Sequence, residues 1–425
     1  MNNENIYFQY MYSYPHKKAY YDIEEIEVLE SLKALKADNV TLYIHIPFCS
    51  SKCGYCNLFS IPIKNGDSII DDYIDAVCRH IKEYGNLLAD KNIKITSLVI
   101  GGGTPLILSI KQMEKLFFTV ENNFNVDIRD IDFVIETSPN ETKYEKLQYI
   151  KEKGVKRISI GIQSFIQEEL NNLYRNHDVN SCEIALKKLI DVKFSITNLD
   201  FIYGIKNQSI ESLLYSINKG LSYNPEEIFL YPLYIRKDTA LYNKMKVDVE
   251  MQNKMYKEAV NLLKSRGYFQ VSMRRFVKEK PKNILSCGFE TMISVGCGGR
   301  SYVGNVHYCE PYKSERKQCT SVLKEYIAKQ DFFKGLKGYV LDKDEEKRRF
   351  IIKNLGYYNG INLEEYKNLF GNDIEDEYPI LKKICNKKAA IIEKNRLMLT
   401  ELGMGYSDII LSKWISDRVK KRMGL

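Results

Sequence analysis

The sequence predicts an α/β fold, an open or partly closed barrel built from six strand-helix units. From Val40 to about residue 235, short apolar runs rich in β-branched residues alternate with amphipathic helical stretches. Such alternation implies parallel strands joined by right-handed crossovers. Six units are too few for a closed eight-stranded barrel, so we expect a partial (β/α)6 barrel.

The predicted strands are the six apolar runs of this segment, at residues 42–46, 95–100, 131–135, 158–162, 196–202 and 228–235. Residues 68–88 and 111–124 have the apolar spacing of amphipathic helices. In the first of these, Tyr73, Val77 and Ile81 fall on one face. Farther along, alternating apolar residues over 389–400 predict a small winged hairpin.

Composition is that of an ordinary globular protein, with 44% hydrophobic and 28% charged residues in a chain of 425. A chain of this length can bury a large core and carry a second domain. No apolar run is long enough to span a membrane, and the start lacks the pattern of a secretory signal, so we expect a cytoplasmic protein. The 63 basic and 55 acidic residues are mixed along the chain, which favours a solvated lysine-rich surface over a nucleic-acid interface.

Three cysteines on one short loop carry the strongest functional signal. Cys49, Cys53 and Cys56 follow a Cys-x3-Cys-x2-Cys spacing just after the first predicted strand. Three thiolates can hold three irons of a cubane cluster and leave the fourth iron open to chelate a substrate or cofactor. The alternatives are three unrelated thiols or a zinc site, although structural zinc normally takes four ligands in spaced pairs.

Polar residues follow the other predicted strands where they end. The second strand runs into residues 101–105, Gly-Gly-Gly-Thr-Pro, and the next three lead to Glu136, Gln163 and Asp200. A parallel barrel has its active site at the carboxyl ends of its strands, so these groups and the cysteine loop share one rim. Alternatively, the glycines form only a tight turn, and Glu136 is satisfied by the amides of a helix N-terminus. The glycine loop lacks the lysine of a P-loop, so we do not expect it to bind phosphate.

The cysteine loop, with Tyr55 before its last cysteine, resembles the radical S-adenosylmethionine (SAM) superfamily. That resemblance implies a 4Fe-4S cluster on Cys49, Cys53 and Cys56, whose open iron binds the amino and carboxylate groups of SAM. One electron from the cluster then splits SAM into methionine and a 5'-deoxyadenosyl radical. The resemblance also implies a partial (β/α)6 barrel and an electron donor such as flavodoxin or ferredoxin.

Within the superfamily, the phrases at 43–49, 101–105, 159–165 and 198–204 resemble the oxygen-independent coproporphyrinogen III oxidase group, which includes haem chaperones. This implies an N-terminal arm at 1–39, a core barrel at 40–270, and a mostly helical, winged-helix-like accessory domain at 271–425. The implied SAM contacts are Tyr43, Tyr55, Gly102, Gly103, Thr104, Glu136, Gln163, Arg175 and Asp200. From spacing alone, Arg175 is equally well a surface helix residue.

Two departures from that group bear on function. Leu58 stands where the oxidases have a further cysteine, and residues 281–288 lack the His-Asn-x-x-Tyr-Trp phrase of the haem chaperones. We therefore expect a radical SAM enzyme acting on an unidentified small-molecule or tetrapyrrole substrate. The alternative is a haem-binding or haem-delivering protein that retains a 4Fe-4S cluster.

Several residues leave alternatives open. Cys287, Cys297, Cys309 and Cys319 surround a glycine turn at 296–299 and are either separate thiols or ligands of an auxiliary cluster. His307 is either a core histidine or a haem ligand. The stretch 12–18 either covers the barrel mouth or is simply an ordered arm.

Overall fold

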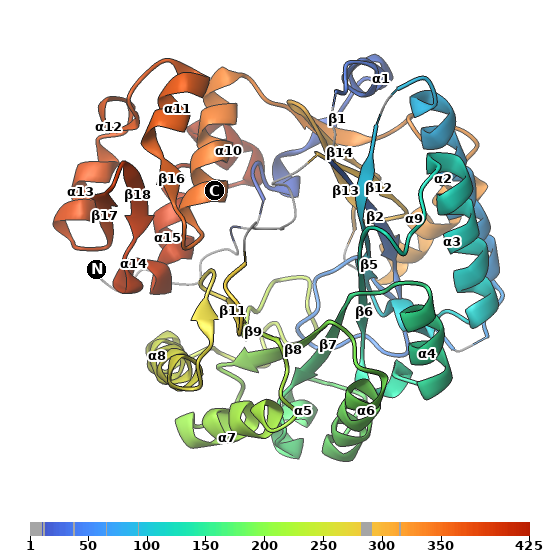
Figure 1. Cartoon of the computed structure of the whole chain (residues 1–425), viewed down its shortest axis with the longest axis horizontal. Coiled ribbons are helices and arrows are strands. Elements are labelled where there is room, and N and C mark those ends of the chain that lie inside the picture. The colour runs from blue at the N-terminus through green and yellow to red at the C-terminus, as the bar shows by residue number, and fades with distance from the viewer. Residues whose placement is uncertain are drawn as a thin grey trace.

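Six consecutive parallel strands form the partial barrel in the computed structural model, with helices around its outer face (Figure 1). The structure describes residues 11, 13–36, 39–64, 66–91, 93–281, 291–313 and 316–425. The barrel strands are β2 (Val40–Ile46), β5 (Ile95–Gly102), β6 (Asp132–Thr137), β7 (Arg157–Gln163), β8 (Ile196–Tyr203) and β9 (Glu227–Pro232). Every neighbouring pair among them is parallel, which confirms the predicted fold class.

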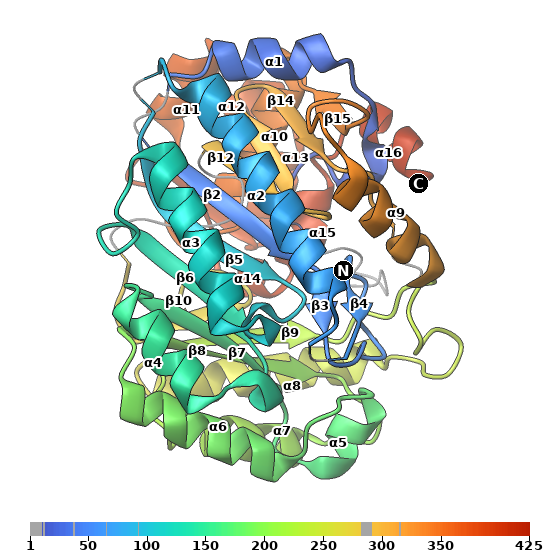
Figure 2. The same ribbon diagram turned by 90° about the vertical axis from the view of Figure 1, so that its right-hand side faces the viewer.

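The helices that connect these strands form the outer layer of the barrel (Figure 2). They are α2 (Ile69–Leu88), α3 (Ile110–Phe124), α4 (Tyr144–Glu152), α5 (Gln167–Asn172), α6 (Val179–Val192), α7 (Ile210–Leu221) and α8 (Val249–Ser265). The first two confirm the helices predicted at 68–88 and 111–124. Short 3-10 turns, η2 (Pro105–Ile107) and η3 (Pro139–Glu141), precede α3 and α4.

Strand alternation divides the barrel side chains into two sets. Leu42, Ile44 and Ile46 of β2 are buried in the apolar core that α2 and its neighbours share. On β8, Phe201 packs so closely on α7 that a Cβ at Gly220 would lie 2.6 Å from its ring. The other set faces the barrel interior, and it contains the polar residues of the candidate site.

The main sheet extends beyond the barrel in both directions. Its order is β1-β15-β14-β13-β12-β2-β5-β6-β7-β8-β9-β11-β10. The added strands are β1 (Tyr21–Asp22), β10 (Phe269–Gln270), β11 (Arg275–Val277), β12 (Thr291–Val295), β13 (Arg300–Val303), β14 (Val306–Cys309) and β15 (Lys337–Val340). Sequence analysis missed β12, which pairs with β2 as a seventh parallel strand. The sheet therefore crosses residue 270, and the division into domains there stays a prediction.

A second apolar core lies in the C-terminal part, at the left of Figure 1. Its helices are α10 (Lys343–Leu355), α11 (Leu363–Phe370), α12 (Ile374–Glu377), α13 (Ile380–Asn386), α14 (Glu401–Gly405), α15 (Ser407–Ser412) and α16 (Asp417–Met423). Its small sheet has the order β16-β18-β17, made of β16 (Ile361–Asn362), β17 (Ala390–Glu393) and β18 (Arg396–Leu399). The antiparallel pair of β17 and β18 confirms the hairpin predicted at 389–400.

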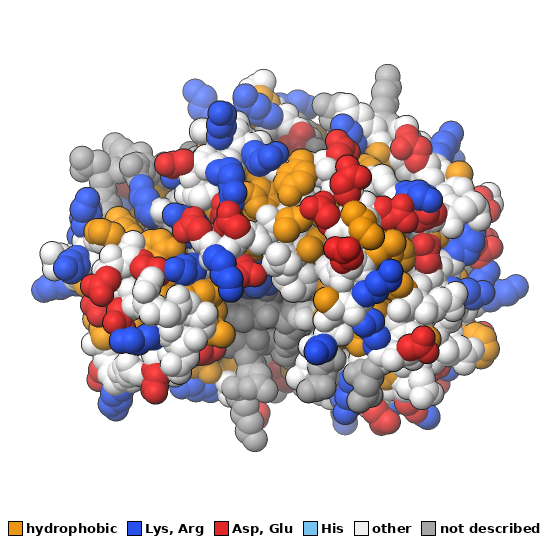
Figure 3. Space-filling view, turned by 90° about the horizontal axis from the view of Figure 1, so that it is seen from above, with side chains coloured by type: hydrophobic (Ala, Val, Ile, Leu, Met, Phe, Trp, Pro, Cys, Tyr) orange, Lys and Arg blue, Asp and Glu red, His pale blue; other side chains and the backbone are white. Residues whose placement is uncertain are grey.

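The remaining elements join these parts. They are η1 (Lys17–Ala19), α1 (Glu25–Lys33), β3 (Phe48–Cys49), β4 (Ile61–Pro62) and α9 (Arg316–Ala328). From the N-terminal arm, Tyr14 and Ala19 pack into the C-terminal core. Basic and acidic side chains are interspersed over the face seen in Figure 3. None of the helices in the described ranges is both long and apolar enough to cross a membrane.

Candidate functional site

The cysteine loop begins directly after β2 and is tied to several distant segments. β3 pairs with β4 on the far side of the loop. Gly54 donates its N–H to the Leu173 carbonyl at 2.9 Å, and its own carbonyl accepts from Leu241 N–H at 2.9 Å. A Cβ at Gly54 would lie 2.9 Å from side-chain atoms of both Leu241 and Tyr174. The loop is therefore held in one shape by contacts from the segments after β7 and β9.

Polar groups lie within hydrogen-bond distance of all three half-buried cysteine sulfurs. The Thr104 hydroxyl donates to Cys49 Sγ at 3.6 Å. Arg175 Nη1 donates to Cys53 Sγ at 3.1 Å. Cys56 Sγ lies 3.7 Å from Ser60 Oγ. Donors around thiolate ligands are the groups by which proteins set the properties of an iron-sulfur cluster.

Burial disfavours the charged form of these sulfurs in the protein alone. It raises the pKa of Cys49 to about 12 despite the Thr104 hydroxyl, and burial likewise raises the pKa of Cys56. A bound metal ion deprotonates a coordinating thiol, so its positive charge would stabilise the buried thiolates. Across the described part of the chain, no three His, Cys, Asp or Glu side chains converge to hold a single metal ion. In a cubane, each thiolate binds a different iron.

The glycine loop after β5 packs on the cysteine loop. Gly103 N–H donates to the Ile46 carbonyl at 2.8 Å, and Thr104 N–H donates to the Phe48 carbonyl at 2.7 Å. A Cβ at Gly103 would lie 2.5 Å from that Phe48 oxygen. Gly102 has a φ of +113°, and a Cβ there would lie 2.5 Å from the His45 ring. Both glycines are needed for this packing, whatever they contact in a bound ligand.

Glu136 and Asp200 are the two carboxylates on the rim. Glu136 Oε2 accepts a hydrogen bond from the Gly102 N–H at 3.0 Å, so an amide at the end of β5 and not a helix N-terminus satisfies it. Asp200 Oδ1 accepts from Asn198 Nδ2 at 2.7 Å. Burial raises the pKa of Glu136, and it raises the pKa of Asp200 to about 7 with a further contribution from Glu136. Neither carboxylate has an ion-pair partner in the described part of the chain.

Two buried amide oxygens in the barrel lack a hydrogen-bond partner. Gln163 is 6% exposed, and its Oε1 contacts no donor. Its φ of +71° accompanies a shift in the register between β7 and β8. Asn198 donates to Ser159 and Asp200, but its own Oδ1 has no partner. Unsatisfied buried acceptors and left-handed non-glycine residues are both costly, and both concentrate at functional sites.

Arg175 lies in the site and not on the surface. Besides Cys53 Sγ, its guanidinium donates to the Gly161 carbonyl at 2.7 Å and to the Tyr55 hydroxyl at 3.4 Å. Tyr43 lies on β2, and its hydroxyl is 3.1 Å from His45 Nδ1. All nine predicted SAM contacts thus lie on the cysteine loop, at the carboxyl ends of the strands or in the segments that follow them.

Sequence reasoning missed three residues of this site. His45 joins Tyr43 to the Phe59 carbonyl, which its Nε2 approaches to 3.0 Å. Asn198 stands two residues before Asp200 on β8, and the period of two in a strand could have placed both in the barrel. No local signal distinguishes Ser60 from an ordinary loop serine.

A buried ion-pair cluster lies at the amino-terminal ends of β7 and β9, away from the rim. Arg157 Nε donates to Glu227 at 2.6 Å, and Arg275 pairs with the other oxygen of the same carboxylate. Burial by itself raises the pKa of Glu227, but the two guanidinium groups outweigh it and lower the pKa. The rim carboxylates have no such neighbours in direct contact.

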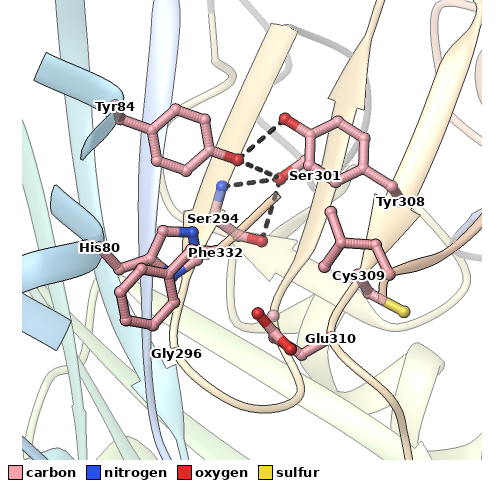
Figure 4. Close-up of a pocket in the computed structure, with 11 residues that line it drawn as sticks. His80, Tyr84, Ser294, Gly296, Ser301, Tyr308, Cys309, Glu310 and Phe332 are labelled. Carbon is pink, nitrogen blue, oxygen red and sulfur yellow. Dashed lines mark hydrogen bonds between the residues drawn. The ribbon is translucent and has the colours of Figure 1, made fainter. Parts of the chain in front are cut away.

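Another polar cluster lies on the opposite face of the sheet, between α2 and strands β12 to β14 (Figure 4). Tyr84 and Tyr308 share a hydrogen bond of 2.8 Å, and Ser301 accepts the Ser294 N–H at 3.0 Å. The cavity beside them has a volume of about 10 Å³, about the least that can hold one water molecule. We assign this cluster a structural role.

The structure gives the burial of the other cysteines and of His307, and the alternatives stated for them stay predictions. Cys297, Cys309 and Cys319 are buried. Cys287 lies outside the described residues, as does Tyr12 of the arm. His307 is 0% exposed, and neither of its ring nitrogens has a hydrogen-bond partner.

Comparison with known proteins assigns the family. The family model of the Radical SAM superfamily matches residues 43–219. The chain is 30% identical over 275 residues to the heme chaperone HemW of Buchnera aphidicola subsp. Acyrthosiphon pisum, covering 62% of this chain and 70% of that one. It is 24% identical over 427 residues to the oxygen-independent coproporphyrinogen III oxidase of Salmonella typhimurium, covering 92% and 90%.

The chain belongs to the radical SAM superfamily. Within that superfamily, its relatives are haem chaperones and oxygen-independent coproporphyrinogen III oxidases, which confirms the predicted group. The superfamily's cofactors are a 4Fe-4S cluster and SAM. The structure of coproporphyrinogen III oxidase (HemN) from Escherichia coli has the same fold, with a TM-score of 0.83 over 95% of this chain and 96% of that one at 21% identity.

Proposed function

We propose that this chain binds a 4Fe-4S cluster through Cys49, Cys53 and Cys56 and cleaves SAM reductively to a 5'-deoxyadenosyl radical that acts on a second molecule. The observation that carries the proposal is a juxtaposition. Three cysteine sulfurs with hydrogen-bond donors lie beside a barrel rim where buried acceptor atoms have no partner.

The donor set on the loop fits a cluster. When bound, a 4Fe-4S cluster supplies the electron that splits SAM. The Arg175 guanidinium, always charged, donates to the Cys53 sulfur and offsets the negative charge of a thiolate there. Thr104 and Ser60 provide neutral hydroxyls for the other two sulfurs. These contacts orient the three side chains before any metal arrives.

The acceptor set in the barrel fits SAM. The ligand presents an ammonium group, ribose hydroxyls and an adenine amine, all of which are hydrogen-bond donors. Glu136 and Asp200 each have lone pairs to spare, and Gln163 Oε1 and Asn198 Oδ1 have no donor at all. Bound SAM would satisfy buried acceptors that are costly to leave unpaired.

The test is production of 5'-deoxyadenosine by anaerobically reconstituted, dithionite-reduced protein without added substrate. We expect slow formation in wild type, none in Cys53→Ala, and wild-type formation in the control Cys385→Ala, whose half-buried thiol lies on α13. Reduced flavodoxin or ferredoxin should replace dithionite. Absence of 5'-deoxyadenosine from protein that carries a full cluster and binds SAM would contradict the proposal.

A second candidate is a haem-binding or haem-delivering protein that retains the cluster. It is favoured by the relative at 30% identity, which is a heme chaperone. Haem titration of the anaerobically purified protein, run beside the 5'-deoxyadenosine assay, discriminates the two. Stoichiometric haem binding without SAM cleavage would favour the chaperone.

Turnover of coproporphyrinogen III is not part of the proposal, because Leu58 replaces a cysteine of the oxidases. Leu58 is 45% exposed at the edge of the cysteine loop and offers no thiol beside the cluster. We expect no complementation of an anaerobically grown strain that lacks its own oxygen-independent oxidase. Restored haem synthesis, with product verified by chromatography, would make the oxidase activity the better assignment.

A further inference from the structure

Tyr174 has a strained backbone conformation although it is not buried. Its φ is +56°, in the left-handed region that favours glycine, and the residue is 42% exposed. A bulky residue with a positive φ is uncommon, and such strain concentrates at functional sites. Burial of the ring does not explain the conformation, because much of the residue is in contact with solvent. The ring therefore indicates a role at the surface.

The Tyr174 ring lies directly on the cysteine loop. A Cβ on Gly54 would lie 2.9 Å from the ring, and Gly54 is bonded to the predicted cluster ligand Cys53. Arg175 is the next residue of the chain, and its Nη1 donates to Cys53 Sγ at 3.1 Å. An exposed aromatic ring is thus joined to a cluster ligand through one residue and one hydrogen bond. Because electron tunnelling weakens steeply with distance, this is a favourable point of entry for an electron.

A lysine from another segment lies beside the same ring. Lys244 Nζ is 5.6 Å from the Tyr174 ring centroid. It belongs to the turn after β9, which is fixed on the cysteine loop because the Leu241 N–H donates to the Gly54 carbonyl at 2.9 Å. Lys244 is exposed, and it forms no ion pair within the described ranges of the chain. Its charge is therefore available to a partner that approaches Tyr174.

A second lysine extends the positive charge. Lys206 follows β8, and its carbonyl accepts a hydrogen bond at 3.0 Å from the side chain of Asn172, two residues before Tyr174. Lys206 is exposed and has no ion pair in the part of the chain that the structure describes. A carboxylate of this region, Glu168, accepts a hydrogen bond from Asn207 at 3.0 Å. We refer to Tyr174, Lys206 and Lys244 as the loop face.

The loop face and the acceptor atoms that fit SAM differ in exposure. Gln163 is buried in the barrel, whereas all three residues of the loop face are exposed. The face lies in the region where β3 and β4 of the cysteine loop meet the segment after α5, at the lower right of Figure 2. A partner on the loop face would reach the ligand Cys53 without entering the barrel.

We propose that Tyr174, Lys206 and Lys244 form the docking surface for a small acidic electron-carrier protein that reduces the cluster. The inference rests on the proposed function, because that reaction consumes one electron for each SAM cleaved. The reduced carrier loses one electron and the cluster gains it, and no bond forms or breaks. Two unpaired cations around one aromatic ring suit the small interfaces of transient electron-transfer complexes, in which opposite charges speed the encounter.

The first experiment measures binding of oxidised flavodoxin, an acidic carrier, to the reconstituted full chain by calorimetry. The affinity should fall as salt is added, because exposed charges are screened. Lys206→Glu and Lys244→Glu should each weaken binding roughly tenfold, since each places a like charge against the acidic partner. Lys187→Glu is the matched control, because Lys187 is an exposed lysine on the outer helix α6, and it should bind as wild type.

The variant Tyr174→Gly separates docking from a merely structural role. Glycine adopts a φ of +56° without strain, so the variant removes the ring and keeps the backbone conformation. The readout is the flavodoxin-driven rate of substrate-free 5'-deoxyadenosine formation, divided by the dithionite-driven rate of the same variant. Dithionite is a small ion that needs no docking surface, so this ratio should fall roughly tenfold. A ring that only shielded the loop would lower both rates together and leave the ratio at its wild-type value.

The inference would be overturned by wild-type flavodoxin affinity in both lysine variants, by an equal loss in Lys187→Glu, or by an unchanged rate ratio in Tyr174→Gly. Should Tyr174→Gly lose its cluster, the lysine variants still decide. Failure of the wild type to form 5'-deoxyadenosine with dithionite is a different result. It would count against the proposed function, while the binding measurement with oxidised flavodoxin would still test the docking surface.

Discussion

Carboxylates have different surroundings in the barrel and at its junction with the C-terminal part. At the junction, Asp408 of α15 is 1% exposed and pairs with Arg274, while Tyr234 donates to it at 2.6 Å. In the barrel rim, Asp200 accepts one hydrogen bond from a neutral amide, and Glu136 accepts one from a backbone N–H.

Glu345, which lies where the N-terminal arm meets the C-terminal core, also differs from the rim carboxylates. Glu345 is 0% exposed and accepts from Ser416 Oγ at 2.7 Å and from Arg418 Nη2 at 2.9 Å, with Tyr14 as a further donor. A buried carboxylate whose lone pairs are filled by arginine and hydroxyl groups joins segments and has no capacity left for a ligand. The half-buried carboxylates of the rim keep lone pairs for a ligand, and this distinguishes the candidate site from a structural joint.

Loss of the cluster is the largest effect we expect. Cys49→Ala, Cys53→Ala and Cys56→Ala should each abolish the single 4Fe-4S cluster of anaerobically reconstituted protein, because each thiolate is the only protein ligand of its iron. Iron analysis and the electron paramagnetic resonance spectrum of the reduced protein measure this. Cys385→Ala is the control, and a triple variant that still bound a full complement of iron would refute the assignment.

The stability of the protein should depend far more on the carboxylate at the junction with the C-terminal part than on a carboxylate of the candidate site. Asp408→Asn should lower the free energy of unfolding by about 3 to 5 kcal/mol, because it removes the carboxylate that faces the buried Arg274 guanidinium. Asp200→Asn should destabilise the protein far less, since Asp200 forms no ion pair among the described residues and the nearby Arg157 is already paired with Glu227. Urea unfolding of the two variants side by side tests the contrast, which would be broken by similar losses in both.

SAM affinity, in contrast to stability, should depend on the rim carboxylates. Glu136→Gln and Asp200→Asn should each weaken SAM binding by about 1.5 to 3 kcal/mol, or roughly ten- to a hundredfold, through loss of a charge-assisted hydrogen bond. Calorimetry on the reconstituted protein is the measurement. Asp132→Asn is a matched control, because Asp132 is an exposed carboxylate at the opposite end of the same strand as Glu136. Unchanged affinity in both rim variants would mean that SAM binds elsewhere.

The smallest effect concerns pH and stability. The pKa of Asp200 is raised to about 7 in the folded chain, so the native state holds a proton that the unfolded state releases from about pH 4 upward. Stability should therefore fall as the pH rises between these values, by about 1 to 2 kcal/mol for a partly exposed carboxyl. Asp200→Asn should remove this part of the pH dependence in thermal unfolding of SAM-free protein. A wild-type slope in the variant would show that other groups cause it.

The predicted strands matched the barrel because their signal is local. A run such as residues 95–100 must form a buried parallel strand wherever its neighbours come from, since it has too many apolar side chains to face water. β12 escaped prediction for the opposite reason. It is short, and only its pairing with β2, some 250 residues earlier in the chain, identifies it as part of the same parallel sheet.

The sequence by itself determined the chemistry of the site: the spacing of Cys49, Cys53 and Cys56, and the polar residues at the carboxyl ends of the strands. Both are properties of contiguous segments, and parallel strands bring their ends together by geometry alone. Only the tertiary structure decided that Arg175 reaches the Cys53 sulfur, that Asp408 forms an ion pair with Arg274, and that Lys17 lies beside Tyr312. Such contacts join residues more than 100 positions apart, and no local pattern encodes which distant charge will fill a given carboxylate and which will be left to a ligand.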